Sequence, residues 1–297
     1  MDHRAFLSSL DADEKLKLQR LSTGKGVAHL LGHLAVIGVL GAYIVLSLPF
    51  WQIVLLPYGT AVIFLFTLEH ECTHATPFAS KQLNEWVGRI CGFILILPFE
   101  WFRYFHLAHH KFTNDPESDP ELAGPRPDNW PAMIVYVSGL PYWRSMIRQT
   151  LINAFSTPTD HFLPAKSLPR IRRGARLMVL AYGLAGVSLF FSDVLVWLWL
   201  VPILIGQPFL RLYLLAEHGR CPPVANMFEN TRTTFTNRLL RFLAWNMPYH
   251  AEHHAFPSVP FWQLPEFHRL ALNELKVTSD GYASFTKSYV SEFERAQ

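Results

Sequence analysis

The sequence predicts an all-α integral membrane protein with four transmembrane helices, arranged as two hairpins below a helical cytoplasmic cap. Of its 297 residues, 50% are hydrophobic and only 16% are charged, whereas about a quarter of the residues are charged in typical soluble domains. No lysine or arginine occurs between Lys25 and Lys81, or between Arg176 and Arg211. Each of these gaps holds two transmembrane helices, since one such helix needs about 20 mostly apolar residues.

The first gap predicts a hairpin with spans at about 27–48 and 51–69, and the second predicts spans at about 175–192 and 194–216. Basic residues lie beyond the ends of these spans that are remote from the hairpin turns. Because cytoplasmic segments are enriched in lysine and arginine, we expect both hairpins to point outward and both termini to be cytoplasmic. Residues 1–297 then form a single domain, and we expect a bacterial inner membrane as its location.

The cytoplasmic cap is expected to comprise residues 70–174 and 217–297. Within it, the apolar run 89–98 is too short to span a bilayer. The longer stretch Trp130–Phe155 is interrupted by Gly139 and Pro141, so we expect an amphipathic surface helix here and not a fifth span.

Nine of the fourteen histidines fall into four clusters, each at a boundary between apolar and polar sequence. Neutral imidazole is the commonest metal ligand in proteins. Residues spaced by three or four positions share one face of a helix, so the rings within each cluster can converge. Nine ligands are too many for one ion and suit a dinuclear site at the join between spans and cap. The predicted ligands are His70, His74, His106, His109, His110, His218, His250, His253 and His254.

Several carboxylates and one amide lie near these histidines and are candidates to orient the rings. Metal-bound imidazoles usually donate their second N–H to such a group. The candidates are Glu69, Glu71, Glu217, Glu252, Asp115, Asp119 and Asn246. Affinity alone would favour copper or zinc on nitrogen ligands, so the ligand set by itself leaves the metal open.

The other five histidines are not expected to bind metal. His3 is expected in a mobile terminus, His161 in a proline-rich loop and His268 on the exposed cap. His29 and His33 lie four residues apart in the first span, where we expect neutral, hydrogen-bonded rings.

The first histidine cluster also allows a second interpretation, as part of a protease site. The sequence from His70 to His74 also matches the HExxH signature of zinc metalloproteases, in which the glutamate is the general base. A protease would use these two histidines and would leave seven clustered ones unexplained. The net charge of +3 is small and gives no indication of nucleic-acid binding, and the three cysteines are scattered without a disulfide pattern.

The three boxes HECTH, HLAHH and HAEHH resemble, in order and spacing, those of the membrane fatty acid desaturase family, a histidine-box superfamily of di-iron desaturases and hydroxylases. The resemblance covers about residues 65–268, and His218 matches the extra histidine that such enzymes supply between the second and third boxes. It implies two Fe ions held by the nine histidines, molecular oxygen, and electrons from a separate soluble donor such as ferredoxin.

The resemblance also limits the substrate. A second box of the form HxxHH favours desaturation of an acyl chain in a lipid or lipid-like substrate over terminal hydroxylation. A hydroxylase or ketolase that acts on a carotenoid or a small apolar substrate remains the alternative within the superfamily.

Overall fold

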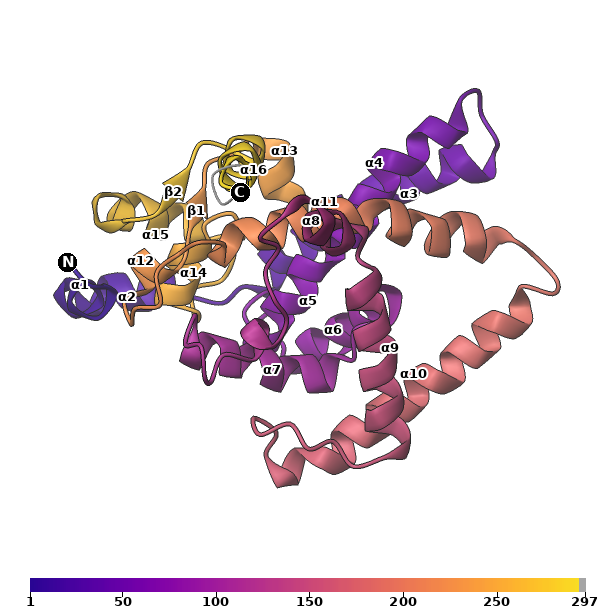
Figure 1. Cartoon of the computed structure of the whole chain (residues 1–297), viewed down its shortest axis with the longest axis horizontal. Coiled ribbons are helices and arrows are strands. Elements are labelled where there is room, and N and C mark those ends of the chain that lie inside the picture. Colours follow the sequence, from indigo (N-terminus) through magenta and orange to yellow (C-terminus); the bar gives the residue numbers. More distant parts are fainter. Residues whose placement is uncertain (294–297) are drawn as a thin grey trace.

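The computed structural model describes residues 1–293 and is predominantly helical (Figure 1). Its first seven helices are α1 (His3–Ser9), α2 (Ala12–Leu18), α3 (Thr23–Val45), α4 (Trp51–Ile63), α5 (Leu65–His74), α6 (Lys81–Leu95) and α7 (Phe99–Phe112). The central elements are η1 (Pro120–Ala123), α8 (Trp130–Ser138), α9 (Leu140–Phe155), η2 (Ala165–Ser167), α10 (Leu168–Ser188), η3 (Val196–Leu200) and α11 (Val201–His218). The C-terminal part holds α12 (Met227–Asn230), β1 (Thr233–Thr234), α13 (Arg238–Leu243), α14 (His250–Ala255), α15 (Leu264–Ala271), η4 (Leu272–Glu274), β2 (Thr278–Ser279) and α16 (Tyr282–Ser291).

The all-α prediction is confirmed, with one small addition. The strands β1 and β2 pair in parallel over two residues each and tie the segment after α11 to the segment before α16. Element η3 is a π-helical turn that leads directly into α11.

Among residues 1–293, three helical stretches are long and apolar enough to cross a membrane: Ala12–Val45, Trp51–His74 and Val196–His218. The second stretch contains the predicted second span, and the other two overlap the predicted first and fourth spans. A fourth crossing is possible if α6 and α7, which meet at a bend of 98°, are taken as one broken span. The predicted span 175–192 overlaps α10, which is not among these stretches; α10 begins with an arginine-rich turn. Four spans therefore remain a prediction.

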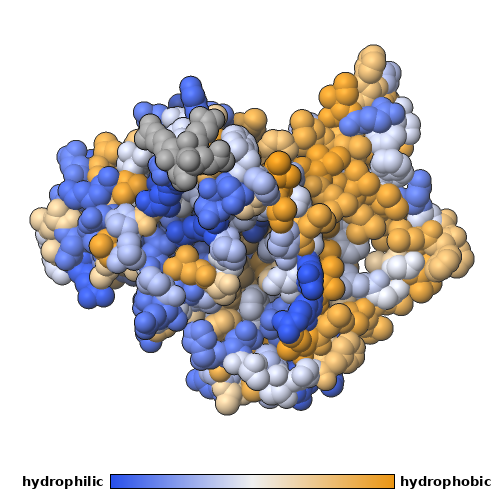
Figure 2. Space-filling model, viewed as in Figure 1, coloured by the Kyte–Doolittle hydropathy of each residue, from blue (hydrophilic) through white to orange (hydrophobic). Residues whose placement is uncertain are grey.

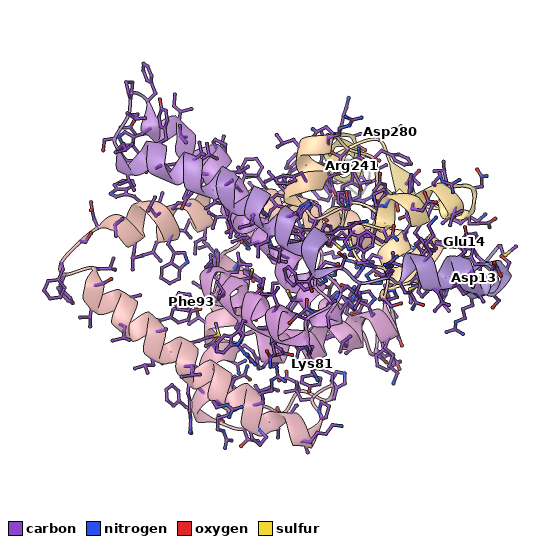
Figure 3. All side chains as sticks on the ribbon, turned by 180° about the vertical axis from the view of Figure 1, so that it is seen from behind. Asp13, Glu14, Lys81, Phe93, Arg241 and Asp280 are labelled. Atoms are coloured by element: carbon purple, nitrogen blue, oxygen red, sulfur yellow. The ribbon has the colours of Figure 1, made fainter. Side chains whose placement is uncertain are left out.

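The two hairpins project from the same side of the molecule, away from the N-terminus and from α15 and α16 (Figure 1). Apolar residues gather over this half of the visible surface (Figure 2). On α10 alone, Leu177, Leu180 and Leu184 are exposed. Charged residues such as Asp13, Glu14 and Asp280 lie at the opposite end (Figure 3). This division is the one expected of a protein with one end in lipid and the other in water.

Two glycines allow α4 and α11 to pack closely where the hairpins meet. A Cβ atom on Gly206 would lie 2.9 Å from the Cβ of Ile63 and closer still to the carbonyl oxygen of Gly59. A Cβ atom on Gly59 would likewise collide with the backbone of Pro202. Small residues serve this purpose in membrane helix pairs, where close backbone approach replaces the hydrophobic effect.

We therefore expect Gly206→Val to lower the free energy of unfolding by about 3 kcal/mol, because the two helices must separate to admit the side chain. Chemical unfolding in detergent micelles measures the change. Gly38→Val on α3 is the matched control, since a Cβ there meets no atom within 4 Å. Equal effects of the two substitutions would contradict this account of the helix crossing.

The predicted surface helix 130–155 is two helices, α8 and α9. They are separated at Gly139, whose φ of 71° is a conformation that favours glycine. On α9, the apolar side chains of Ile147, Leu151 and Phe155 are spaced by four residues and are all exposed. This stripe agrees with the predicted amphipathic character.

The prediction that His3 lies in a mobile terminus is wrong. Its side chain is 8% exposed, because α1 packs on the C-terminal part of the chain through the contact of Phe6 with Phe228. Asn226 accepts a hydrogen bond from the His3 backbone N–H at 3.0 Å, and the His3 Nδ1 accepts one from the Met227 N–H at 3.2 Å.

This arrangement predicts that α1 is released in acid. Burial lowers the pKa of His3 below its ordinary value of 6.5, so the neutral ring that accepts from Met227 is favoured in the folded protein. Its contribution to stability is fully present above pH of about 6.5 and is lost as the pH falls toward the lowered pKa. Amide exchange in α1, corrected for intrinsic rates, should accelerate from pH 7.5 to 5. In His3→Phe this acceleration should vanish; exchange that is independent of pH in the unaltered protein would refute the prediction.

Candidate metal centre

Four helices bring the nine predicted ligand histidines together. The last turn of α5 carries His70 and His74, and α11 ends at His218. The last two turns of α7 and the short helix α14 each contribute three rings spaced i, i+3 and i+4. Seven of the nine side chains are buried, and His74 and His110 are half-buried. Helical spacing thus turns the rings of each cluster to one side of their helix, as the sequence predicts. The tertiary fold then brings the four helices together.

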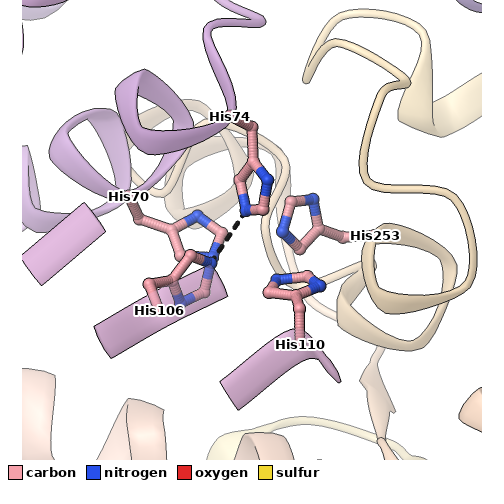
Figure 4. A group of neighbouring side chains, drawn as sticks. All are labelled: His70, His74, His106, His110 and His253. Carbon is pink, nitrogen blue, oxygen red and sulfur yellow. Dashed lines mark hydrogen bonds between the residues drawn. The ribbon is translucent and has the colours of Figure 1, made fainter. Parts of the chain in front are cut away.

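Five rings form a first group, shown in Figure 4: His70, His74, His106, His110 and His253. One ring nitrogen from each lies within 4.8 Å of the corresponding nitrogen of every other member. The Nε2 atoms of His74 and His106 are 2.8 Å apart. The rings point toward one another from α5, α7 and α14.

The remaining four rings form a second group beside the first. The ligand atoms of His109, His218 and His254 lie within 4.8 Å of one another. The Nε2 of His218 is 3.1 Å from the Nε2 of His109 and 3.1 Å from that of His250. The two groups touch where His110 stacks on His254 at a centroid distance of 4.0 Å.

These residues fit metal ions. Neither ring nitrogen of His70, His110 or His253 has a hydrogen-bond partner within the described residues, although the atoms are buried. Leaving a buried polar atom unpaired costs about 1–3 kcal/mol, and coordination removes that cost. Two nitrogens bound at right angles to one ion at about 2.1 Å would be about 3.0 Å apart, which matches the separations between the Nε2 atoms. Burial also lowers the pKa of His253 and His254 well below the ordinary value, which keeps these rings neutral and able to bind metal.

Three of the predicted orienting carboxylates do face ligand histidines. Asp119 lies 2.9 Å from the Nδ1 of His109 through its Oδ1, and Glu217 lies 3.3 Å from the Nδ1 of His250. Glu71 is 3.7 Å from the Nδ1 of His253. In each pair the outer nitrogen faces the carboxylate, so the inner nitrogen is directed at the histidine group.

The other candidates have different contacts. Asn246 donates to the carbonyl of Phe261, and Asp115 accepts from the N–H of Glu117. Glu69 has no hydrogen-bond partner within residues 1–293.

Glu252 instead joins the third box to Thr233 and His268, neither of which was predicted to contact the histidine boxes. Its carboxylate accepts hydrogen bonds from the Thr233 hydroxyl and from the Nδ1 of His268. The prediction that His268 lies on an exposed surface is therefore wrong: its side chain is 15% exposed. A lone histidine on an amphipathic helix gives no signal of such a contact.

Two further contacts of ligand histidines, one with a threonine and one with an asparagine, were not predicted from the sequence. Thr113 lies 3.1 Å from the Nδ1 of His254, and the Asn230 carbonyl lies 3.4 Å from the Nδ1 of His218. Thr113 follows the second box by three residues, and this helix-like spacing was the available signal. Asn230 is distant in sequence and had none.

His29 and His33 are hydrogen-bonded outside the metal groups, as predicted. The Nε2 of His29 is 2.9 Å from the Phe242 carbonyl, and that of His33 is 2.8 Å from the Ala61 carbonyl. Trp245 donates to the second nitrogen of His33 at 3.1 Å. Each ring therefore joins α3 to a second helix by a hydrogen bond, His29 to α13 and His33 to α4.

Residues 45–286 match the protein family described as "Fatty acid desaturase". An sn-1 oleoyl-lipid 12-desaturase of Picosynechococcus sp. is 23% identical over 78% of this chain and 72% of its own length. An sn-1 acyl-lipid omega-3 desaturase (ferredoxin) of Synechocystis sp. is 26% identical over 46% of this chain and 39% of its own length. A zeaxanthin 4-ketolase of Chlamydomonas reinhardtii is 24% identical over 70% of this chain and 41% of its own length.

Proposed function

The chain belongs to the fatty acid desaturase family and is an oxidoreductase, and from this premise we propose that it uses two iron ions and O₂ to desaturate an acyl chain of a lipid or lipid-like substrate. The observation that carries the proposal is the meeting of nine histidines from four helices in two adjacent groups. A zinc protease would need only two of them and a third ligand.

We assign one ion to each group. His70, His74, His106, His110 and His253 would hold the first, and His109, His218, His250 and His254 the second. Bound iron supplies the activation of O₂ and the removal of hydrogen from an unactivated C–H bond. Asp119 holds the His109 ring from outside by a hydrogen bond, and Glu217 and Glu71 lie 3.3 and 3.7 Å from the Nδ1 atoms of His250 and His253.

The remaining tasks of the reaction fall to the protein around the site. Burial of the ligand rings keeps water from the reacting carbon. The apolar half of the molecule supports a position of the site next to the bilayer (Figure 2), which would deliver the substrate. Electrons would come from a soluble donor of the ferredoxin type, which the name of the Synechocystis relative also specifies. The site and both termini would lie in the cytoplasm of a bacterial cell.

Metal content and product analysis test this proposal together. Protein purified without oxygen is expected to contain about two irons per chain. Membranes that contain it, supplied with reduced ferredoxin and O₂, should accumulate new double bonds in their acyl chains, detectable by mass spectrometry. One zinc per chain and hydrolysis that needs no oxygen would overturn the proposal in favour of a protease.

The similarity to a zeaxanthin 4-ketolase favours one second candidate, the oxygenation of a carotenoid or small apolar substrate. Labelled oxygen separates the two reactions. With ¹⁸O₂, a desaturase forms an alkene that carries no label, whereas a hydroxylase or ketolase incorporates ¹⁸O into the product.

A further inference from the structure

A cluster of charged side chains lies outside the two histidine groups, where α6, the start of α7 and α10 meet. The carboxylates of Glu85 and Glu100 pair here with the guanidinium groups of Arg89, Arg103 and Arg170. Three cations thus share two anions, so the cluster carries an excess of positive charge.

The cluster also has donors that the protein does not use. The Nε of Arg170 is buried and has no hydrogen-bond partner in the described part of the chain; the Oε1 of Glu100 is 3.9 Å away. Arg173, one turn further along α10, is exposed and forms no ion pair within residues 1–293. Lys81, at the start of α6, adds a further exposed cation beside Glu85. These groups together can accommodate an anion.

The cluster borders a cleft of about 400 Å³ between α6, α7 and α10. Small-molecule sites commonly have volumes of about 300–1,000 Å³. The cleft can be reached from the surface, because Trp86 and Leu177, which line it, are 63% and 60% exposed. Its wall combines guanidinium groups with apolar side chains, among them Arg89, Arg170, Arg173, Phe93, Leu177 and Met178.

The charged and apolar parts of the wall are separated along the helices. On α10, the side chains that line the cleft change from Arg170 and Arg173 to Leu177, and the exposed leucines of α10 follow toward the hairpin turn. On α6, Phe93 lies toward the hairpins and Lys81 lies away from them (Figure 3). A phospholipid at a membrane surface has its charged and apolar parts in this same order.

The enrichment of cytoplasmic segments in basic residues explains why arginines occur at this depth, but not why some of them face the cleft. Arg172 and Arg176 belong to the same run in the sequence and donate instead to the carbonyls of Ser156 and Ala154. An acidic protein surface would pair with the cations but would leave the apolar part of the cleft uncovered. A lipid covers both parts.

We propose that this cleft binds an anionic phospholipid. The headgroup phosphate accepts hydrogen bonds from Arg170 and Arg173, and an acyl chain lies along Phe93 and Leu177. Guanidinium groups suit phosphate because two parallel N–H groups can bind two of its oxygens, and basic pockets between membrane helices are known to bind anionic headgroups. None of the nine ligand histidines lines the cleft, so the inference does not depend on the proposed reaction.

A pair of matched lipids tests this directly. The full chain, purified in a nonionic detergent, is titrated with dioleoylphosphatidylglycerol or dioleoylphosphatidylcholine, and native mass spectrometry counts the bound lipids. The two lipids share their acyl chains and the phosphate diester but differ in the net charge of the headgroup. We expect the phosphatidylglycerol to bind at least about tenfold more tightly, because the excess of guanidinium groups disfavours the choline cation.

Two neighbouring arginines supply the matched variants. Arg173→Gln should lower the preference for phosphatidylglycerol about fivefold, the effect of one basic residue beside an anionic headgroup. Arg172→Gln removes the same charge one residue earlier on α10, outside the cleft, and should leave the preference unchanged. Because Arg173 is exposed, neither variant should shift the unfolding temperature, which circular dichroism measures.

Equal binding of the two lipids would overturn the proposal, and so would a preference that survives in Arg173→Gln or falls equally in Arg172→Gln. Glycerol 3-phosphate carries the anion without the acyl chains and should bind at least about a hundredfold more weakly than the phosphatidylglycerol. Equal affinity would assign the cleft to a soluble phosphate ester. Equal binding of the two lipids together with weaker binding of ferredoxin in Arg173→Gln would assign it to an acidic protein.

Discussion

Replacing His253 by alanine is expected to lower the rate of substrate oxidation by roughly 1000-fold or more, beyond the 10- to 100-fold typical of losing an outer partner. The ring is 0% exposed, and its centroid lies 4.6 Å from that of His70 and 4.8 Å from those of His74 and His110. Neither of its nitrogens has a hydrogen-bond partner within residues 1–293. We therefore expect the variant to retain about one iron per chain or less, measured by elemental analysis of purified protein.

The same experiment needs a control for folding. His161→Ala removes an exposed histidine and should change neither iron content nor rate. Iron(II) should raise the unfolding temperature of the unaltered protein but raise that of His253→Ala much less, since a ligand stabilises only the state that binds it. Two irons and a normal rate in His253→Ala would remove this residue from the metal centre.

The parts of the site that could be predicted are those that depend on local spacing. The triplets that begin at His106 and His250 lie on helices, and helical geometry alone turns their rings to one side. The positions of the apolar runs likewise predicted the helices at 23–45, 51–74 and 196–218 closely. In each case the signal lies within one helix.

What could not be predicted depends on contacts between distant segments. His268 meets Glu252 only because α15 packs against α14, and His3 is buried only because α1 packs on the C-terminal part of the chain. No pattern around either histidine reports these contacts. That Glu69 has no hydrogen-bond partner among the described residues is also a tertiary property, because Glu69 and Glu71 both adjoin His70 in α5 and yet differ in their contacts.

Asp119→Asn tests how far the metal centre depends on groups that do not bind metal. The carboxylate is 4% exposed and lies 2.9 and 3.1 Å from the Nδ1 of His109 through its two oxygens. It thereby holds the proton on Nδ1 and leaves Nε2 free to face His218. An amide keeps the size of the side chain but removes the negative charge and can present an N–H to the ring. We expect iron affinity or rate to fall by about 10- to 100-fold, less than for a lost ligand.

The effect should be specific to the contact with His109. Asp115→Asn makes the same chemical change four residues earlier in the same loop and should leave iron binding and rate unchanged. Within the described part of the chain, that carboxylate accepts only from the Glu117 N–H. Asp119 also accepts from the N–H groups of Asn114 and Glu121, so a loss of loop structure has to be separated from a loss of ring orientation. Asp119→Glu keeps the charge while disturbing those turns. If it binds iron as poorly as Asp119→Asn, the loop and not the charge facing His109 controls the second histidine group; if it binds iron better, the charge does.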